Sequence, residues 1–160
     1  MMTRALWVGA VVLILASVRV EASPIGDWVL SDGSAVVRIE AQGTNYTARI
    51  VRLLRPEFAI IDGEGSPGAP RVDIHNPDRA LQQRSLLGLE IAFDLQAEGE
   101  QLKGRIYDPT SGKTYRCRIA LRGDEYLEVR GFIGFSALGR SMYWQRLDSY
   151  TAQMRSLLGF

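Results

Sequence analysis

Residues 104–115 read GRIYDPTSGKTY, a pattern that predicts two antiparallel strands joined by a tight turn. Small or apolar residues alternate with polar ones through 102–107, as in a strand that buries one face. Pro109 fixes φ at the second position of the turn, and Gly112 suits a position with positive φ. The alternation resumes at Tyr115 and continues to Leu121. The rest of the fold is built outward from this predicted hairpin.

Further strand patterns lie on both sides of the hairpin, separated mostly by short turns rich in Gly, Asp or Glu. The expected strands cover residues 36–40, 46–54, 86–95, 101–108, 113–122, 126–132 and 140–147. Consecutive strands with short connections favour an antiparallel meander, and closing the meander removes its unpaired edges. The predicted fold class is therefore all-β, an antiparallel meander closed into a barrel of roughly eight strands.

Three segments break the strand pattern. Residues 55–71 contain three prolines and three glycines, which exclude regular structure. An irregular segment of this length is either a lid on a binding site or a mobile loop. A short helix is predicted at 77–84, because Asn76 suits the N-cap, Pro77 the first helical position and Asp78 the positive end of the helix dipole. A C-terminal helix is predicted within 149–160, packed on the outside of the barrel.

The first 22 residues have the pattern of a signal peptide. Arg4 precedes an apolar stretch at 5–18, Arg19 ends the stretch, and Ala22 provides a small residue for cleavage. The 14 apolar positions are too few to span a bilayer comfortably. We expect export to the periplasm or the medium, no stable membrane anchor, and one domain at 23–160.

Composition excludes several classes of partner. Removal of 1–22 takes away Arg4, Arg19 and Glu21, which leaves 17 basic and 17 acidic residues of the original 19 and 18. This balance argues against nucleic acid as a partner. Cys117 is the only cysteine, so no intramolecular disulfide is possible, and its place in an alternating strand predicts a small buried side chain.

Eight short motifs carry a resemblance to a known family. They are Gly26-Asp27-Trp28, Asp73 with Asn76-Pro77-Asp78, Leu86-Leu87-Gly88, Gly104 to Pro109, Gly112 to Tyr115, Val129 to Gly134, Leu138-Gly139-Arg140 and Trp144-Gln145-Arg146. With these motifs the chain resembles an exported bacterial family of unknown function, domain of unknown function 2147. The resemblance implies a lipocalin-like (calycin) barrel and an envelope location, and it implies no reaction. Gln82 departs from the family, which tends to have arginine there.

The resemblance also implies how the barrel is closed. In lipocalins a Gly-x-Trp motif opens the first strand, and a basic residue after the last strand packs on the indole. Gly26 and Trp28 match this motif, and we expect Arg146 to cover Trp28 through a cation–π contact.

Asp73, His75, Asn76 and Asp78 form the first candidate ligand site. In one interpretation they build a metal or acid–base site; in the other, Asn76 caps a helix and the aspartates close a turn. One histidine with carboxylates is a poor zinc set, and the capping interpretation accounts for the residue types. We therefore expect no metal and no cofactor.

Arginines on the late strands form the second candidate, and Arg105 and Arg130 are its members with a possible ligand role. They either line an anion-binding surface or belong to a solvated outer face with carboxylate partners. Tyr107 and Asp108 are expected to serve packing and the turn. The segment Gly112-Lys113-Thr114 is no phosphate-binding loop, because position 107 lacks the required glycine and a strand follows.

The function that these patterns favour is non-catalytic binding of a small hydrophobic or amphipathic ligand in the barrel cup. The main alternative is an interaction or structural protein of the envelope that uses the barrel exterior and the C-terminal helix. An outer-membrane barrel and a hydrolase dependent on Asp73 and His75 are weaker alternatives.

Overall fold

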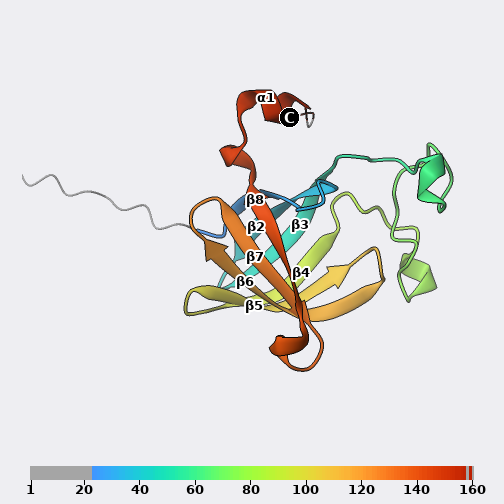
Figure 1. Cartoon of the computed structure of the whole chain (residues 1–160). Helices are drawn as coiled ribbons and strands as arrows, with labels where there is room; N and C mark the ends of the chain where they lie inside the picture. The colour runs from blue at the N-terminus through green and yellow to red at the C-terminus, as the bar shows by residue number, and fades with distance from the viewer. Residues whose placement is uncertain (1–22, 158, 160) are drawn as a thin grey trace, which may run out of the picture.

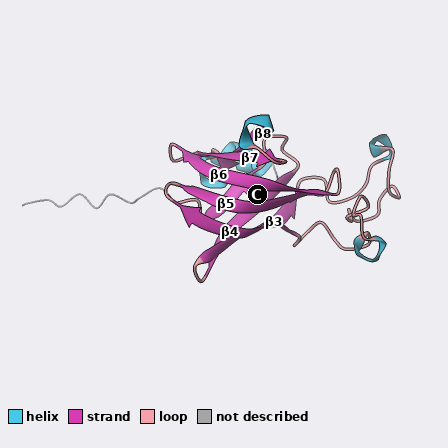
Figure 2. Ribbon diagram, turned by 90° about the horizontal axis from the view of Figure 1, so that it is seen from below, coloured by secondary structure: helices cyan, strands magenta, loops and turns pink. Residues whose placement is uncertain are grey.

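The computed structural model describes residues 23–157 and 159, so the predicted signal peptide lies outside the described residues. Eight antiparallel strands form one closed barrel in sequence order, as predicted (Figures 1 and 2). They are β1 (Gly26–Val29), β2 (Ala35–Gln42), β3 (Asn45–Leu53), β4 (Glu90–Glu98), β5 (Gln101–Asp108), β6 (Lys113–Arg122), β7 (Tyr126–Phe132) and β8 (Arg140–Arg146). The predicted hairpin forms β5 and β6, with Asp108 paired to Lys113 at its tip.

Up-and-down connectivity gives the barrel two different ends. One end, here called the floor, holds the start of β1 and the short turns at 43–44, 99–100 and 123–125. The other end, here called the mouth, holds the connections at 30–34, 54–89, 109–112 and 133–139. The long β3–β4 connection projects beyond the strand ends at the mouth (Figure 2).

Arg146 lies over Trp28 at the floor, with the guanidinium carbon 4.2 Å from the centroid of the indole ring. The same guanidinium donates hydrogen bonds to the carbonyl oxygens of Ser23 (2.6 Å), Ile25 (3.3 Å) and Asp124 (2.8 Å). Gly26 has φ +127°, and a Cβ there would lie 3.2 Å from an Arg146 nitrogen. A single arginine thus joins the N-terminal segment, the β6–β7 turn and the end of β8.

Apolar side chains fill the barrel interior. The largest ones with almost no exposed surface are Trp28, Trp144, Ile39, Leu95, Ile119 and Leu127. They belong to one continuous cluster that also contains Cys117, the predicted small buried side chain. Burial raises the pKa of the Cys117 thiol to about 12, which keeps it protonated and unreactive at neutral pH. This core occupies the barrel cup, where we expected a ligand to bind.

The short helix predicted at 77–84 is present only as a 3-10 helix of three residues, η2 (Arg79–Leu81). Asp78, not Asn76, caps the turn by accepting a hydrogen bond from the Ala80 N–H at 2.9 Å. So short a segment gains little from helical hydrogen bonds, and here tertiary partners replace them. The Arg84 carbonyl accepts from the Asp73 N–H at 3.0 Å, which bends the chain back on itself.

Several strand boundaries differ from the prediction, most of all the start of β4. The strand expected at 86–95 begins only at Glu90, because Gly88 has φ +86° and the Leu89 N–H bonds the Leu86 carbonyl in a turn. The short C-terminal helix lies within the predicted range, as α1 (Ala152–Leu157), and follows the 3-10 turn η4 (Leu147–Ser149). No helix in the described part of the chain is long and apolar enough to cross a membrane.

The glycine- and proline-rich segment 55–71 is a folded projection at the mouth. A β-bridge joins Glu57 to Pro70, and Phe58 is buried beneath the Arg71 guanidinium, whose central carbon lies 5.2 Å from the ring centroid. Arg71 also forms an ion pair with Asp62 at 2.5 Å. The 3-10 turns η1 (Ile60–Asp62) and η2 both lie in the β3–β4 connection, away from the barrel (Figure 1).

Candidate functional site

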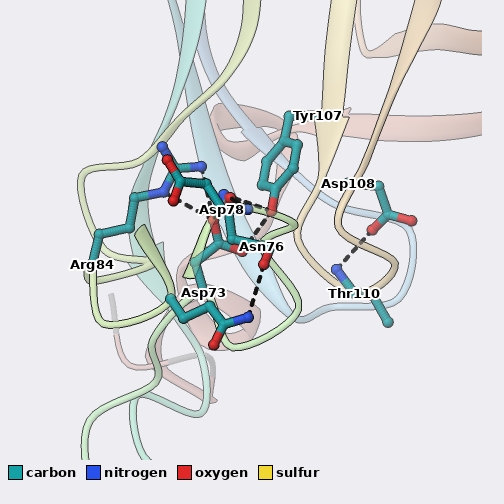
Figure 3. A network of polar contacts seen from close by, with 8 residues as sticks. Asp73, Asn76, Asp78, Arg84, Tyr107, Asp108 and Thr110 are labelled. Carbon is teal, nitrogen blue, oxygen red and sulfur yellow. Dashed lines mark hydrogen bonds and ion pairs between the residues drawn. The ribbon is translucent and has the colours of Figure 1, made fainter. Parts of the chain in front are cut away.

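A buried polar network lies where the β3–β4 connection meets the tip of the β5–β6 hairpin (Figure 3). Its centre is Asp73, whose side chain has no exposed surface. The Tyr107 hydroxyl donates to one carboxylate oxygen at 2.7 Å. The other oxygen accepts from the Asn76 amide at 2.8 Å and from Arg84 Nε at 2.9 Å. The carboxylate is therefore fully hydrogen-bonded and paired with a guanidinium, which is how a buried charge is accommodated.

Tyr107 links the network to the barrel wall. It is buried on β5, and the Arg84 guanidinium lies over its ring, with the guanidinium carbon 5.3 Å from the centroid. Burial and the hydrogen bond to Asp73 raise the pKa of Tyr107 to about 12. The hydroxyl thus stays protonated and remains a donor to Asp73 across the physiological range.

Asn76 organises the backbone on the other side of Asp73. Its side-chain carbonyl accepts from the Asp78 N–H at 2.9 Å, and its amide nitrogen also reaches the Tyr107 hydroxyl at 3.2 Å. The Gln82 amide donates to the Asn76 backbone carbonyl at 2.9 Å. Gln82, which departs from the family pattern, thus has a definite structural contact in this chain.

Gly112 lets the hairpin tip meet the connection. It has φ +67°, and a Cβ there would lie 1.9 Å from the His75 carbonyl oxygen, far inside van der Waals contact. Asp108 holds the turn by accepting from the Thr110 N–H at 2.9 Å, and its carbonyl accepts from the Gly112 N–H at 2.8 Å. The hairpin and the network are therefore fitted to each other by a glycine.

A pocket of about 710 Å³, here called the rim pocket, lies between this connection and the barrel wall. Its lining includes Arg49, Arg84, Leu87, Glu90, Phe93, Tyr107 and Thr114. Tyr107 and Thr114 are register partners, and Tyr107 lies two residues after Arg105, whose side chain is exposed. Alternate residues of a strand share a face, so the rim pocket opens on the outer face of the sheet and not into the core.

The rim pocket is lined by both charged and apolar groups. Arg49 is held by Glu90 at 3.2 Å and by the Gly88 carbonyl at 2.7 Å, and Arg84 is held by Asp73. Leu87, Leu89 and Phe93 provide the apolar lining. Two positioned guanidinium groups beside an apolar surface suit a small molecule with an apolar body and an anionic or carbonyl head.

The predicted site residues lie at separate places in the structure. Asp73 and Asn76 belong to the network and Asp78 caps η2, but His75 bonds Glu64 at 2.8 Å in an exposed pair. Arg105 pairs with Asp94 on the outer wall. Arg130 bonds the Ser141 hydroxyl at 3.0 Å and lies on β7. The structure therefore does not assemble these residues into one site.

Arg49 and Phe93 were not predicted as pocket residues. Both lie on strands in patterns that indicate only an exposed face, and the pocket exists because a connection far away in sequence packs over them. Within residues 23–157, no group of three His, Cys, Asp or Glu side chains is placed to hold a metal ion.

Comparisons with known proteins agree with this architecture. The model of the bacterial family "Uncharacterized protein conserved in bacteria (DUF2147)" matches residues 26–146. A solved structure, protein HP1028 from Helicobacter pylori, described as belonging to the lipocalin family, is similar with a TM-score of 0.65. It shares 21% identity over 86% of this chain and 90% of its own. No curated protein sequence gives a significant match. The extent of the family match and the closed eight-stranded barrel show that the chain belongs to the DUF2147 family and has a lipocalin-like fold.

Proposed function

We propose that this protein is an exported, non-catalytic binding protein that holds a small amphipathic ligand in the rim pocket. The observation that supports it most directly is a pocket of about 710 Å³ with both an apolar lining and two positioned arginines. Ligand pockets of roughly 300–1,000 Å³ are typical for small molecules. Export rests on the sequence pattern of residues 1–22.

Because the core is filled, we propose that the ligand binds in the rim pocket and not in the barrel cup. Barrels of about eight strands either hold one small ligand or are filled by their own side chains, and this barrel has Trp28 and Trp144 inside. The rim pocket lies on the outer wall, so a ligand can bind there without displacing the core.

Several contacts argue against the hydrolase alternative. Both oxygens of Asp73 are engaged by neutral or cationic donors, and His75 faces Glu64. An acid–base pair needs a free proton acceptor within reach of the substrate, and Asp73 has no exposed surface.

Binding of dodecanoate, a fatty-acid anion, by titration calorimetry tests the proposal. Leu87 lines the rim pocket and is 54% exposed, so Leu87→Trp fills the pocket without entering the core. We expect this variant to bind dodecanoate about tenfold more weakly or worse, a loss of about 1.4 kcal/mol.

Leu81→Trp is the matched control, because Leu81 is 40% exposed in the same connection and does not line the pocket. Equal weakening in both variants would place the ligand elsewhere. Native mass spectrometry of protein from its own host gives a second readout that does not depend on the chosen probe. Absence of any bound molecule there, together with no dodecanoate binding, would reject the proposal.

A further inference from the structure

The β7–β8 connection at the mouth exposes three large apolar side chains. Ile133 is 71% exposed, Phe135 83% and Leu138 81%, and the last of them ends the 3-10 turn η3 (Ser136–Leu138). The connection projects from the barrel as a separate lobe at the bottom of Figure 1. Exposed apolar groups gathered on one protrusion mark an interaction surface rather than ordinary surface variation.

Arginines surround the base of this lobe. Arg116 and Arg118 on β6 lie over the ring of Phe132, with guanidinium carbons 6.0 and 5.8 Å from its centroid. Arg130 is the register partner of Arg118, and its guanidinium donates to the Ala137 carbonyl inside the lobe at 3.3 Å. These three residues, here called the arginine cluster, fix cationic groups directly beside the apolar side chains.

Acidic groups are scarce at this place. The segment 130–141 contains no Asp or Glu. Among the described residues, no carboxylate forms an ion pair with Arg116 or Arg118. The nearby Glu128 pairs with Arg122 at 2.5 Å and accepts a hydrogen bond from Ser141, which Arg130 also contacts. The hydrogen bonds from Arg122 and Ser141 and the charges of Arg122 and Arg130 lower the pKa of Glu128. The lobe therefore combines apolar tips with a positively charged base, in which Arg116 and Arg118 form no ion pair within the described residues.

We propose that the lobe docks this protein on an anionic lipid bilayer. Ile133, Phe135 and Leu138 enter the boundary between head groups and acyl chains, and the arginine cluster binds lipid phosphates. A convex lobe with apolar tips and cations behind them has the layered polarity of a bilayer surface, whereas a protein partner would need a matching cavity. This inference goes beyond the rim pocket, which lies over other strands.

Flotation with lipid vesicles tests the docking. The full chain is used as recovered from cells, with the same N-terminus verified in every variant. Vesicles contain phosphatidylcholine alone or equal parts of phosphatidylcholine and phosphatidylglycerol. We expect binding to the anionic vesicles that weakens with added salt, and about tenfold or greater loss of that binding for F135S/L138S.

The chain offers a matched control. Ile60 and Ile61 are 85% and 88% exposed on another projection, but their neighbours include Asp62 and Glu64. I60S/I61S should keep the binding of the unchanged protein. R116Q/R118Q should lose preference for anionic vesicles, and its thermal unfolding shows whether Phe132 is still covered. In F135W, a blue shift in the emission of the introduced tryptophan on anionic vesicles would show that the lobe inserts into the bilayer.

Three results would overturn the proposal. The first is no binding to either vesicle, and the second is equal loss in F135S/L138S and I60S/I61S. The third is self-association of the unchanged protein that F135S/L138S abolishes while vesicles remain unbound, which would assign the lobe to a second copy of the chain.

Discussion

Asp73 shows how much one residue can organise. It is fully buried, and its hydrogen bond with Tyr107 joins the β3–β4 connection to β5. Its hydrogen bonds with Arg84 and Asn76 hold two parts of that connection together. A carboxylate in such a place stabilises only while all its partners are present, because each partner loses its own buried hydrogen bond when the carboxylate is removed.

Asp73→Ala should therefore lower the free energy of unfolding by about 3–5 kcal/mol, since it leaves the Arg84 charge and the Tyr107 hydroxyl without their acceptor. Urea unfolding measures this change. Asp78→Ala removes only the cap of η2 and should lower the free energy of unfolding by about 1 kcal/mol. Similar losses in the two variants would mean that the network is not the centre of this region.

At the scale of elements, the hairpin tip and the connection fit only because Gly112 has no side chain. Two effects act at this position, positive φ and the approach of the His75 carbonyl, and they can be separated. Gly123 has φ +65° in the β6–β7 turn, and a Cβ there would meet nothing within 4 Å.

Gly123→Ala should consequently lower the free energy of unfolding by about 1–2 kcal/mol through backbone strain alone. Gly112→Ala should lower the free energy of unfolding clearly more than Gly123→Ala does, because the hairpin must also move away from His75. The movement displaces Thr114 and the rim pocket wall, so dodecanoate binding should weaken in Gly112→Ala only. Urea unfolding and calorimetry check both parts; equal effects of the two substitutions would contradict the fit.

The elements also show where sequence reasoning succeeds. The bounds of β5, β6 and β7 were predicted correctly, because alternation and turn residues such as Pro109 and Gly112 act locally. The helix expected at 77–84 is reduced to η2, because tertiary contacts hold this segment: the Asn76 amide nitrogen donates to Asp73 and reaches Tyr107 while its oxygen accepts from the Asp78 N–H. Of these partners, Tyr107 comes from the distant strand β5.

The site was less predictable than the fold for the same reason. Capping patterns drew attention to Asp73 and Asn76, but nothing local pairs Asp73 with Tyr107 or places Arg49 beside Phe93. The rim pocket is a product of tertiary packing between a long connection and the outer wall. A single sequence carries no periodic signal for such a contact.

For the whole molecule, groups whose pKa is raised by burial shape the response to alkaline pH, and Cys117, Tyr107 and Tyr150 are among them. The pKa of Cys117 is raised from 9.0 to about 12 and that of Tyr107 from 10.0 to about 12, in both cases chiefly by burial. The folded protein thus keeps protons that the unfolded chain releases. Stability from these groups is complete below pH 9 and is lost as the pH rises toward 12.

We expect the free energy of unfolding to fall above pH 9 by roughly 1.4 kcal/mol per pH unit for each group that titrates only in the unfolded chain. Urea unfolding at pH 8, 9, 10 and 11, values chosen around these pKa shifts, measures the slope. Cys117→Ala should remove the part of the slope that begins near pH 9, even if the variant is less stable throughout. An unchanged slope in Cys117→Ala would show that other groups control the alkaline response.

The seam between β1 and β8 has a consequence for the order of folding. Every other pair of neighbouring strands is consecutive in the chain, whereas this seam joins the two ends of the barrel and has only two register pairs, Trp28 with Arg146 and Val29 with Gln145. Bringing such distant segments together has the largest loop-closure entropy in the molecule. The sheet can therefore assemble as an open, curved ribbon first. Arg146 then stabilises the closed barrel, because it contacts Trp28 and the carbonyls of Ser23 and Ile25 across the seam.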